Sequence, residues 1–366
     1  MKNVKRATLI LAALVLFVAR PVNVRAGLAL TSEGQAAGFG LSTFATGFPV
    51  SEGIGPIGVA FPGVGEVLVG DFSGNVRLFS DTDGQIASSV PVAQNYGNGN
   101  VSGMAQVGGN IYMTQAANSD VVQINANGTF DQLIATAPNV GFQNVFGPAI
   151  DPANGDIFAS QSSTGGQFNQ ILDINAATKS LSIFSSGTTY TGQIVFNPSG
   201  SIFYAVTDYP SPNSNAVTGF DAHSGATVFG PVFFPGISNG VALGTGSLAD
   251  DLFVNTQDGQ LIELNLTTLS QTVIASGGAG GFQLYADPNN NSLLVTQLDS
   301  VYRLTAPSDG GFFAPEAVPE PSTFTLFGAG TAFLLGYNWR RRKLPCLASR
   351  ATVTTSAGSA ASEYRL

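Results

Sequence analysis

Histidine and carboxylate side chains are the groups of this chain that could do acid–base chemistry. His223 is the single histidine of the chain and stands in the turn-like run 221–225. A Ser-His-Asp site would need His223 as its base, but a turn at the edge of a sheet lies far from an interior cavity. Asp208, Asp258 and Glu263 fall near expected strand ends, where paired carboxylates could hydrolyse glycosides. With so many carboxylates present, we interpret this nearness as chance and predict no catalytic residue; a carboxylate pair stays an open alternative.

The elements that must position these side chains follow from an internal repeat. A small-residue and apolar start, a turn, an apolar strand, a polar loop and a further strand recur six times. The starts stand at Gly58, Gly103, Gly147, Gly192, Gly240 and Gly281. Successive starts are 41 to 48 residues apart, the period of a four-stranded propeller blade. The sequence therefore predicts an all-β, six-bladed propeller.

The third copy displays the pattern most completely. Residues 148–150 begin an inner strand, 151–156 make a turn of residues that set turn dihedrals, and 157–160 form the second strand. Residues 171–175 and 181–184 are expected as the third and fourth strands. The same frame predicts equivalent turns at 197–200 and 287–290. Helical periodicity is absent, and 45 glycines with 19 prolines suit tight β turns.

Closure of the ring needs a strand from outside the sixth copy, because no convincing fourth strand follows residue 304. Residues 40–47 precede the first start and resemble the fourth strand of the fifth copy. We predict that residues 41–46 pair with residues 301–304, which would bury both edges and close the ring. The propeller is expected to occupy residues 38–306.

The repeats and their Asp-Pro turns resemble the NHL, lactonase and gluconolactonase-like six-bladed propellers over residues 41–306. The resemblance implies a divalent metal at the channel mouth, held by carboxylates and amides one position before each start. Those positions are Ile57, Ser102, Phe146, Thr191, Asn239 and Gly280. Asn239 alone is a plausible ligand, and a hard cation needs several oxygens; Glu52-Gly53 lies too far ahead of Gly58 to match. We predict no metal site and no cofactor, with Ca²⁺ left open and a lactonase with an atypical site as the alternative function.

The charge balance of residues 27–321 narrows the partners. This span has three cations, Arg77, Lys179 and Arg303, against 22 carboxylates, a net charge of −19. Such a surface repels phosphate backbones, so we predict no nucleic-acid binding. Cations and basic or neutral polymers stay open as partners. The only cysteine, Cys346, lies outside this span, so the domain can form no disulfide.

The N-terminus has the three parts of a secretory signal peptide. Lys2, Lys5 and Arg6 form a basic region, residues 7–19 are apolar, and Ala26 precedes Gly27 at a small-residue cleavage site. We predict a signal peptide at 1–26, with residues 27–37 as the leader of the mature chain.

The C-terminal part predicts where the protein goes. A linker at 307–322 contains Pro319-Glu320-Pro321, and an apolar run at 323–339 would be about 26 Å long as a helix. Four cations follow, Arg340, Arg341, Arg342 and Lys343, which favours a transmembrane helix at 323–343 with its C-terminal end in the cytoplasm. An Ala/Ser/Thr-rich tail, 344–366, is expected to be disordered.

This order of Pro-Glu-Pro, apolar segment and basic cluster resembles the PEP-CTERM sorting signal of Gram-negative bacteria. The resemblance implies recognition by an exosortase, with Pro319, Glu320 and Pro321 as the processing motif, and carriers found among bacteria that make exopolysaccharide. We predict an exported protein, anchored in the inner membrane before processing and then at the cell surface or outside. Its expected function is non-enzymatic binding of extracellular polysaccharide or of a surface protein.

Overall fold

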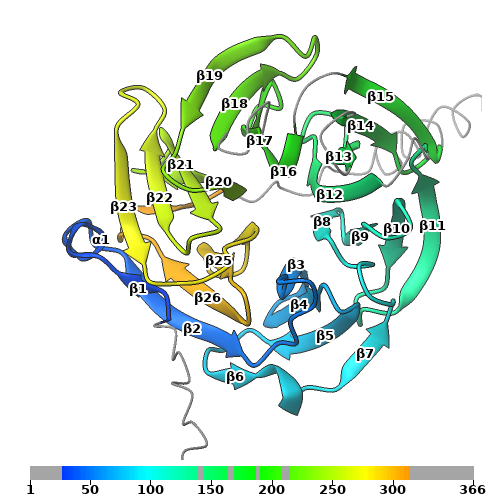
Figure 1. Ribbon diagram of the computed structural model, residues 1–366, viewed down its shortest axis with the longest axis horizontal. Helices are drawn as coiled ribbons and strands as arrows, with labels where there is room; N and C mark the ends of the chain where they lie inside the picture. The colour runs from blue at the N-terminus through cyan, green and yellow to red at the C-terminus, as the bar shows by residue number, and fades with distance from the viewer. Residues whose placement is uncertain (1–26, 139–142, 164–168, 187–189, 208–214, 314–366) are drawn as a thin grey trace, which may run out of the picture. The chain divides into compact units, whose positions relative to one another are not determined.

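The computed structural model describes residues 27–138, 143–163, 169–186, 190–207 and 215–313. Six sheets, antiparallel except for the parallel pairing of 45–46 with 85–86, are arranged around a ring in this part of the chain (Figure 1), and helix is almost absent from it. The all-β, six-bladed fold is therefore confirmed. Within these ranges no helix is long and apolar enough to cross a membrane. The expected signal peptide, C-terminal helix and tail lie outside the described residues.

Each sheet is one blade, and in blades one to four the strands follow chain order from the inside outward. Blade one consists of β3 (Pro56–Gly63), β4 (Glu66–Asp71), β5 (Asn75–Ser80) and β7 (Val92–Asn95). Blade two consists of β8 (Gly103–Val107), β9 (Asn110–Gln115), β10 (Asp120–Ile124) and β11 (Phe130–Thr136). Blade three consists of β12 (Gln143–Ile150), β13 (Ile157–Ser163), β14 (Asn169–Asn175) and β15 (Ser180–Ser186). Blade four consists of β16 (Tyr190–Phe196), β17 (Ile202–Thr207), β18 (Ala216–Asp221) and β19 (Thr227–Phe233).

The last two blades recruit strands from the ends of the domain. Blade five has β20 (Ser238–Gly246), β21 (Asp251–Thr256), β22 (Leu261–Asn265) and β23 (Gln271–Ser276), with β1 (Ala29–Leu30) and β27 (Gly310–Phe312) at its edges. Blade six has β24 (Leu284–Asp287), β25 (Ser292–Thr296), β26 (Ser300–Thr305), then β2 (Gly40–Thr46) and the short β6 (Gln85–Ile86). A 3₁₀ turn spans Ala87–Ser89.

The ring closes where the sequence predicted. β2 pairs antiparallel with β26, with Leu41 opposite Leu304 and Thr46 opposite Ser300. Figure 1 shows the blue β2 beside the orange β26. The N-terminal strand thus supplies the fourth strand that the sixth copy lacks, and the exposed edge of β26 is covered.

Two segments outside the expected propeller range of 38–306 also join the sheets. In the leader, β1 pairs with β23. The short helix α1 (Ser32–Ala36) is capped by Thr31, whose hydroxyl accepts a hydrogen bond from the Gly34 N–H at 3.1 Å. In the expected linker, β27 pairs with β20, and Phe312 packs on Phe253 with ring centroids 5.0 Å apart. These strands are too short for a recognisable alternating pattern, so tertiary contacts decide them.

The repeated glycines stand where neighbouring inner strands approach each other. A Cβ on Gly240 would lie 2.2 Å from the Phe282 carbonyl oxygen of blade six, and one on Gly103 would lie 2.5 Å from Pro148 Cδ of blade three. Side chains at these positions would push adjacent blades apart. Close packing of the inner strands around the axis therefore requires glycine at these positions.

The core lies mainly between neighbouring blades. In one cluster, Tyr112 and Val121 of blade two pack with Ile157 and Leu172 of blade three. A comparable cluster joins blades four and five. Each blade is apolar on both faces for this reason, and the ring leaves a central channel in which the inner strands meet.

Candidate functional site

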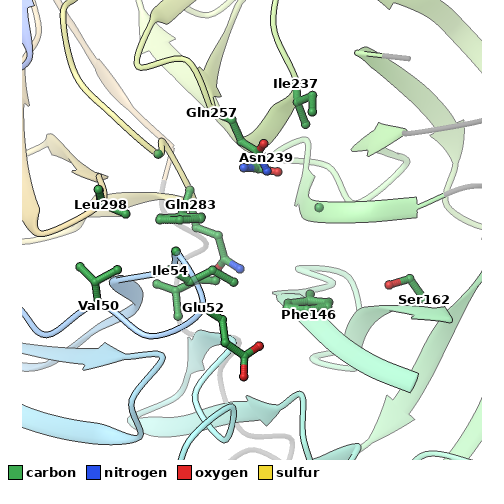
Figure 2. A pocket seen from close by; sticks show the side chains of 15 residues that line it. Val50, Glu52, Ile54, Phe146, Ser162, Ile237, Asn239, Gln257, Gln283 and Leu298 are labelled. Carbon is green, nitrogen blue, oxygen red and sulfur yellow. The ribbon is translucent and has the colours of Figure 1, made fainter. Parts of the chain in front are cut away.

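The mouth of the central channel is a cavity of about 760 Å³ at the beginnings of the inner strands. Four of the six positions expected at the mouth line this cavity: Ile57, Phe146, Asn239 and Gly280. Figure 2 shows Phe146 and Asn239 on different sides of it, with Glu52 at one edge. Ser102 is fully buried instead, where its hydroxyl hydrogen-bonds to the Val145 carbonyl. These four positions, which the resemblance places at the channel mouth, therefore lie around one cavity.

A buried hydrogen-bonded plug forms the floor of the mouth. Gln193 of blade four donates from Nε2 to the Leu284 carbonyl at 2.6 Å and accepts from the Leu284 N–H at 2.8 Å. Gln283 donates to the Ser102 carbonyl at 2.8 Å, and its Oε1 accepts from the Tyr285 hydroxyl.

Tyr285 completes the plug by joining blade six to blade one. Its single hydroxyl hydrogen is shared between Gln283 Oε1 and the Ile57 carbonyl, which is 2.7 Å away, and its oxygen accepts from the Met104 N–H at 3.3 Å. Burial raises the pKa of Tyr285, so the phenol stays neutral. The plug ties blades one, two, four and six together across the axis. It also separates the mouth from the cavity on its other side, which Gln193 and Tyr285 line.

The polar groups that face the mouth are mostly uncharged. Ser162, Asn239 and Gln257 line the cavity, and Gln257 is exposed. Asn239 donates to the Gly281 carbonyl at 2.8 Å, which orients its amide. Glu52 has φ of 55° in the turn before blade one and accepts from Asn98 Nδ2 at 3.2 Å. A non-glycine residue in the left-handed region costs backbone energy and is frequently tied to a function.

Glu52 lines the mouth, although it was not among the positions expected there. It stands six residues before Gly58, whereas the expected positions stand one residue before each start. The chain between them crosses the rim in a tight turn, in which Ser51 and Ile54 exchange backbone hydrogen bonds of 2.8 and 2.9 Å. Recognition of a turn at 51–54 would have predicted this position, because the turn brings Glu52 close to the beginning of β3.

The donor set at the mouth does not fit the divalent metal that the gluconolactonase resemblance implies. Glu52 is the one carboxylate among the residues that line the cavity. No group of three or more histidine, cysteine, aspartate or glutamate side chains with the geometry of a metal site occurs in the described ranges. A hard cation needs several oxygen ligands, anionic ones among them. The residues of the mouth therefore do not match the ligand set of a divalent-metal site.

The carboxylates considered for glycoside hydrolysis have other neighbours. Glu263, on β22, lies with Asp251 in a small recess of blade five, and its pKa is raised to about 7, first by burial and second by the negative charge of Asp251. Asp258 accepts a hydrogen bond from the Thr256 hydroxyl in a turn. Asp208 lies outside the described residues. His223 occupies the exposed turn between β18 and β19, where its backbone N–H donates to Asp221 at 3.2 Å, as the sequence predicted.

A serine that sequence reasoning missed has the spacing of a nucleophile elbow. Residues 236–240 read Gly-Ile-Ser-Asn-Gly, but an elbow needs a sharp turn from strand to helix. Ser238 instead begins β20, is 1% exposed, and its hydroxyl has no hydrogen-bond partner. The chain's single histidine stands on an exposed turn of blade four, so the described residues hold no Ser-His pair.

A family model for the PEP-CTERM protein-sorting motif matches residues 317–343. The chain carries a PEP-CTERM sorting motif. This confirms the resemblance drawn from Pro319-Glu320-Pro321, and the motif implies export, membrane-anchored sorting and processing by an exosortase. No curated protein sequence matches the chain significantly.

Solved structures resemble the propeller. A protein assigned as a gluconolactonase has a TM-score of 0.59 at 15% identity, covering 78% of this chain and 99% of its own. A gluconolactonase from Xanthomonas campestris has a TM-score of 0.58 at 14% identity, covering 77% and 95%. The calcium-binding protein regucalcin from Agrobacterium tumefaciens has a TM-score of 0.54 at 14% identity, covering 75% and 98%. At these identities the likeness establishes the fold alone.

Proposed function

We propose that this protein is an exported, non-enzymatic propeller of the cell envelope that binds a neutral extracellular polysaccharide at its channel mouth. The observation that carries the proposal is the chemistry of the mouth: amide and hydroxyl groups and one carboxylate lie among apolar side chains, which include the aromatic rings of Phe146 and Phe282. Sugars offer hydroxyls to amides and carboxylates, and apolar faces to aromatic rings.

Charge supports a neutral rather than an anionic polymer. The carboxylate of Glu52 stands at the rim, and none of the lining residues is a cation. The domain as a whole is strongly acidic, so a uronic-acid or phosphate polymer would be repelled. A cavity of about 760 Å³ lies within the range of small-ligand sites and would hold a few sugar residues.

Glycan-array binding of the full chain, followed by titration with the strongest neutral oligosaccharide, tests the proposal. Gln257→Ala removes an amide from the mouth, and Glu52→Gln removes the negative charge and replaces one acceptor oxygen by a donor. We expect binding about tenfold weaker for each. Gln35→Ala removes an exposed amide on α1 and serves as the matched control. Unchanged affinity in both mouth variants, or exclusive binding of anionic glycans, would refute the proposal.

A lactonase function is the alternative that the fold resemblance raises. It predicts one tightly held divalent ion per chain and lactone turnover that chelation abolishes. Metal analysis together with a lactone hydrolysis assay therefore separates the two functions. Turnover that requires the metal would overturn the non-enzymatic proposal.

A further inference from the structure

A second cavity, about 580 Å³ in volume, lies on the other side of the plug. Four blades line it with the alanine that stands two residues after the start of the repeat. These residues are Ala60, Ala105, Ala149 and Ala242. Blade four has Ile194 at this position, and blade six lines the cavity with Ala286. Large side chains at the four alanine positions would take up space in the channel, so their small size helps to keep this distal cavity open.

The distal cavity is bounded by aromatic and apolar groups. Phe61, Phe196 and Tyr285 line it, together with Met104, and Phe313 borders it where the chain leaves β27. Broad aromatic surfaces and an adaptable thioether are typical of sites that hold apolar ligands.

The polar atoms in the lining are already paired. Gln106 bonds to both the N–H and the carbonyl of Phe61, at 2.8 and 2.7 Å. Gln193 and Tyr285 are engaged in the plug. These groups would lose bonds if they turned toward a polar ligand, so hydrogen-bonded recognition is unfavourable here.

Charge is absent from the lining. No aspartate, glutamate, lysine, arginine or histidine is among the described residues that line the distal cavity. Arg303, the cation of blade six, is not among the lining residues, and its guanidinium forms ion pairs with Asp81, Asp83 and Asp287. A carboxylate or phosphate headgroup would find no counter-charge, and an ammonium would find no carboxylate.

We propose that the distal cavity is a binding site for an uncharged, predominantly apolar small molecule, such as a long-chain alcohol or another neutral lipid-like compound. Its volume lies within the range of small-molecule pockets. The exposed hairpin at Gly108 and Gly109 borders it and leaves a route from solvent. The site is independent of the mouth, because the plug separates them.

Photolabelling of the full chain with a diazirine-bearing long-chain alcohol tests this site. Mapping of labelled peptides by mass spectrometry is expected to place the label beside Phe61, Phe196 or Tyr285, with excess unlabelled alcohol competing. The corresponding carboxylate is expected to label these peptides at least about tenfold less, because its charge would be buried unpaired. Labelling confined to other parts of the chain would overturn the proposal, and so would equal labelling by the carboxylate.

Cavity-filling variants provide the second measurement. Ala149→Phe is expected to reduce labelling of the distal cavity at least about tenfold, and Ala105→Phe serves as an independent variant if the first does not fold. Ala226→Phe, at an exposed turn of blade four, is the matched control and should label as the unmodified chain does. Full labelling in a folded cavity-filled variant contradicts the proposal. Because the mouth is unaltered, the variants should retain glycan binding, so failure here leaves the proposed function standing.

Discussion

Arg303 holds together carboxylates from two blades at the seam where the ring closes. Its guanidinium is 3.0 Å from Asp287 of blade six and 2.9 Å from Asp83, which follows β5 of blade one, and it also contacts Asp81. It lies over the ring of Phe44 of the closing strand, 5.3 Å from the centroid. One buried cation thus offsets three carboxylates at the position where the N-terminal strand joins.

Replacement of Arg303 by leucine is expected to lower the free energy of unfolding by about 3–5 kcal/mol, because buried carboxylates would lose their counter-charge. Urea unfolding at neutral pH measures the change. Lys179→Leu removes an exposed cation and is expected to change stability by less than about 1 kcal/mol. Equal effects of the two substitutions would show that the seam does not depend on this cluster.

Glu263 makes the stability of the domain depend on pH. Its folded-state pKa of about 7 is above the ordinary value of 4.5, so its contribution is full below about pH 4.5 and is lost as pH rises through about 7. The side chain is only partly buried, which reduces the effect to about 1 kcal/mol.

We expect the full chain to lose about 1 kcal/mol more than Glu263→Gln between pH 5 and pH 8. Denaturant unfolding at the two pH values measures this difference. Glu66→Gln, at an exposed carboxylate, is the control and should follow the unmodified chain. A steeper loss of stability in Glu263→Gln than in the unmodified chain would refute the claim that Glu263 contributes to the pH dependence.

At the scale of elements, β2 is the strand on which ring closure depends. Phe44 is fully buried and packs against Phe79 of blade one with ring centroids 5.9 Å apart, while its strand pairs with β26 of blade six. A strand of seven residues therefore links the first and last blades through both hydrogen bonds and apolar packing.

Phe44→Ala is expected to cost about 3–5 kcal/mol of unfolding free energy by leaving a cavity at this seam. Thermal and urea unfolding give the value. Phe130→Ala on the outer strand of blade two removes a side chain that is 46% exposed, and it should cost less than half as much. A Phe44→Ala protein as stable as Phe130→Ala would mean that the ring does not need this strand.

At the scale of the whole molecule, the surface of the propeller has fewer exposed cations to offset its carboxylates than the composition of residues 27–321 indicates. Of the three cations in residues 27–321, Arg77 and Arg303 are buried in ion pairs and Lys179 is exposed. The outer surface of the described domain therefore presents carboxylates with little positive charge. This charge is the physical basis for the prediction that the partners are neutral or cationic rather than nucleic acids.

Sorting also belongs to the whole chain, because the PEP-CTERM motif at 317–343 lies outside the propeller. Replacement of Pro319, Glu320 and Pro321 by alanine is expected to abolish exosortase processing and leave a full-length membrane species. Immunoblots of membrane and extracellular fractions measure this. The Gln257→Ala variant should be processed normally, and unchanged processing of the triple-alanine variant would argue against recognition of this motif.

Much of the fold could be predicted because each blade repeats the same local signals. Glycine-led starts recur six times at intervals of 41 to 48 residues, and Asp-Pro or Asn-Pro turns follow three of them. A weak signal in one copy is therefore supported by the others. The closing strand was predictable for the same reason, since one copy lacked a strand that the N-terminus could supply. β1 and β27 carry no repeat signal, and their pairing depends on the edges that happen to lie beside them.

The cavities were harder to predict. Glu52 reaches the mouth through a turn that breaks the repeat spacing. Gln193, Gln283 and Tyr285 become a plug only when residues of separate blades meet. From the sequence alone, Asp250-Asp251 is expected to form a solvated turn. Asp251 is buried and accepts from Asn265 at 2.9 Å, because the neighbouring strand folds back over it.

The sequence by itself determined the all-β repeat, the number of blades, the strand that closes the ring, the acidic charge and the sorting motif. These are properties of local pattern and composition, which do not depend on how distant residues meet. The tertiary structure alone decided that a plug divides the channel into a mouth, whose lining includes one carboxylate, and a distal cavity with no charged side chain in its described lining. That division arises from side chains of separate blades meeting at the axis, and their contacts exist only once the ring has closed.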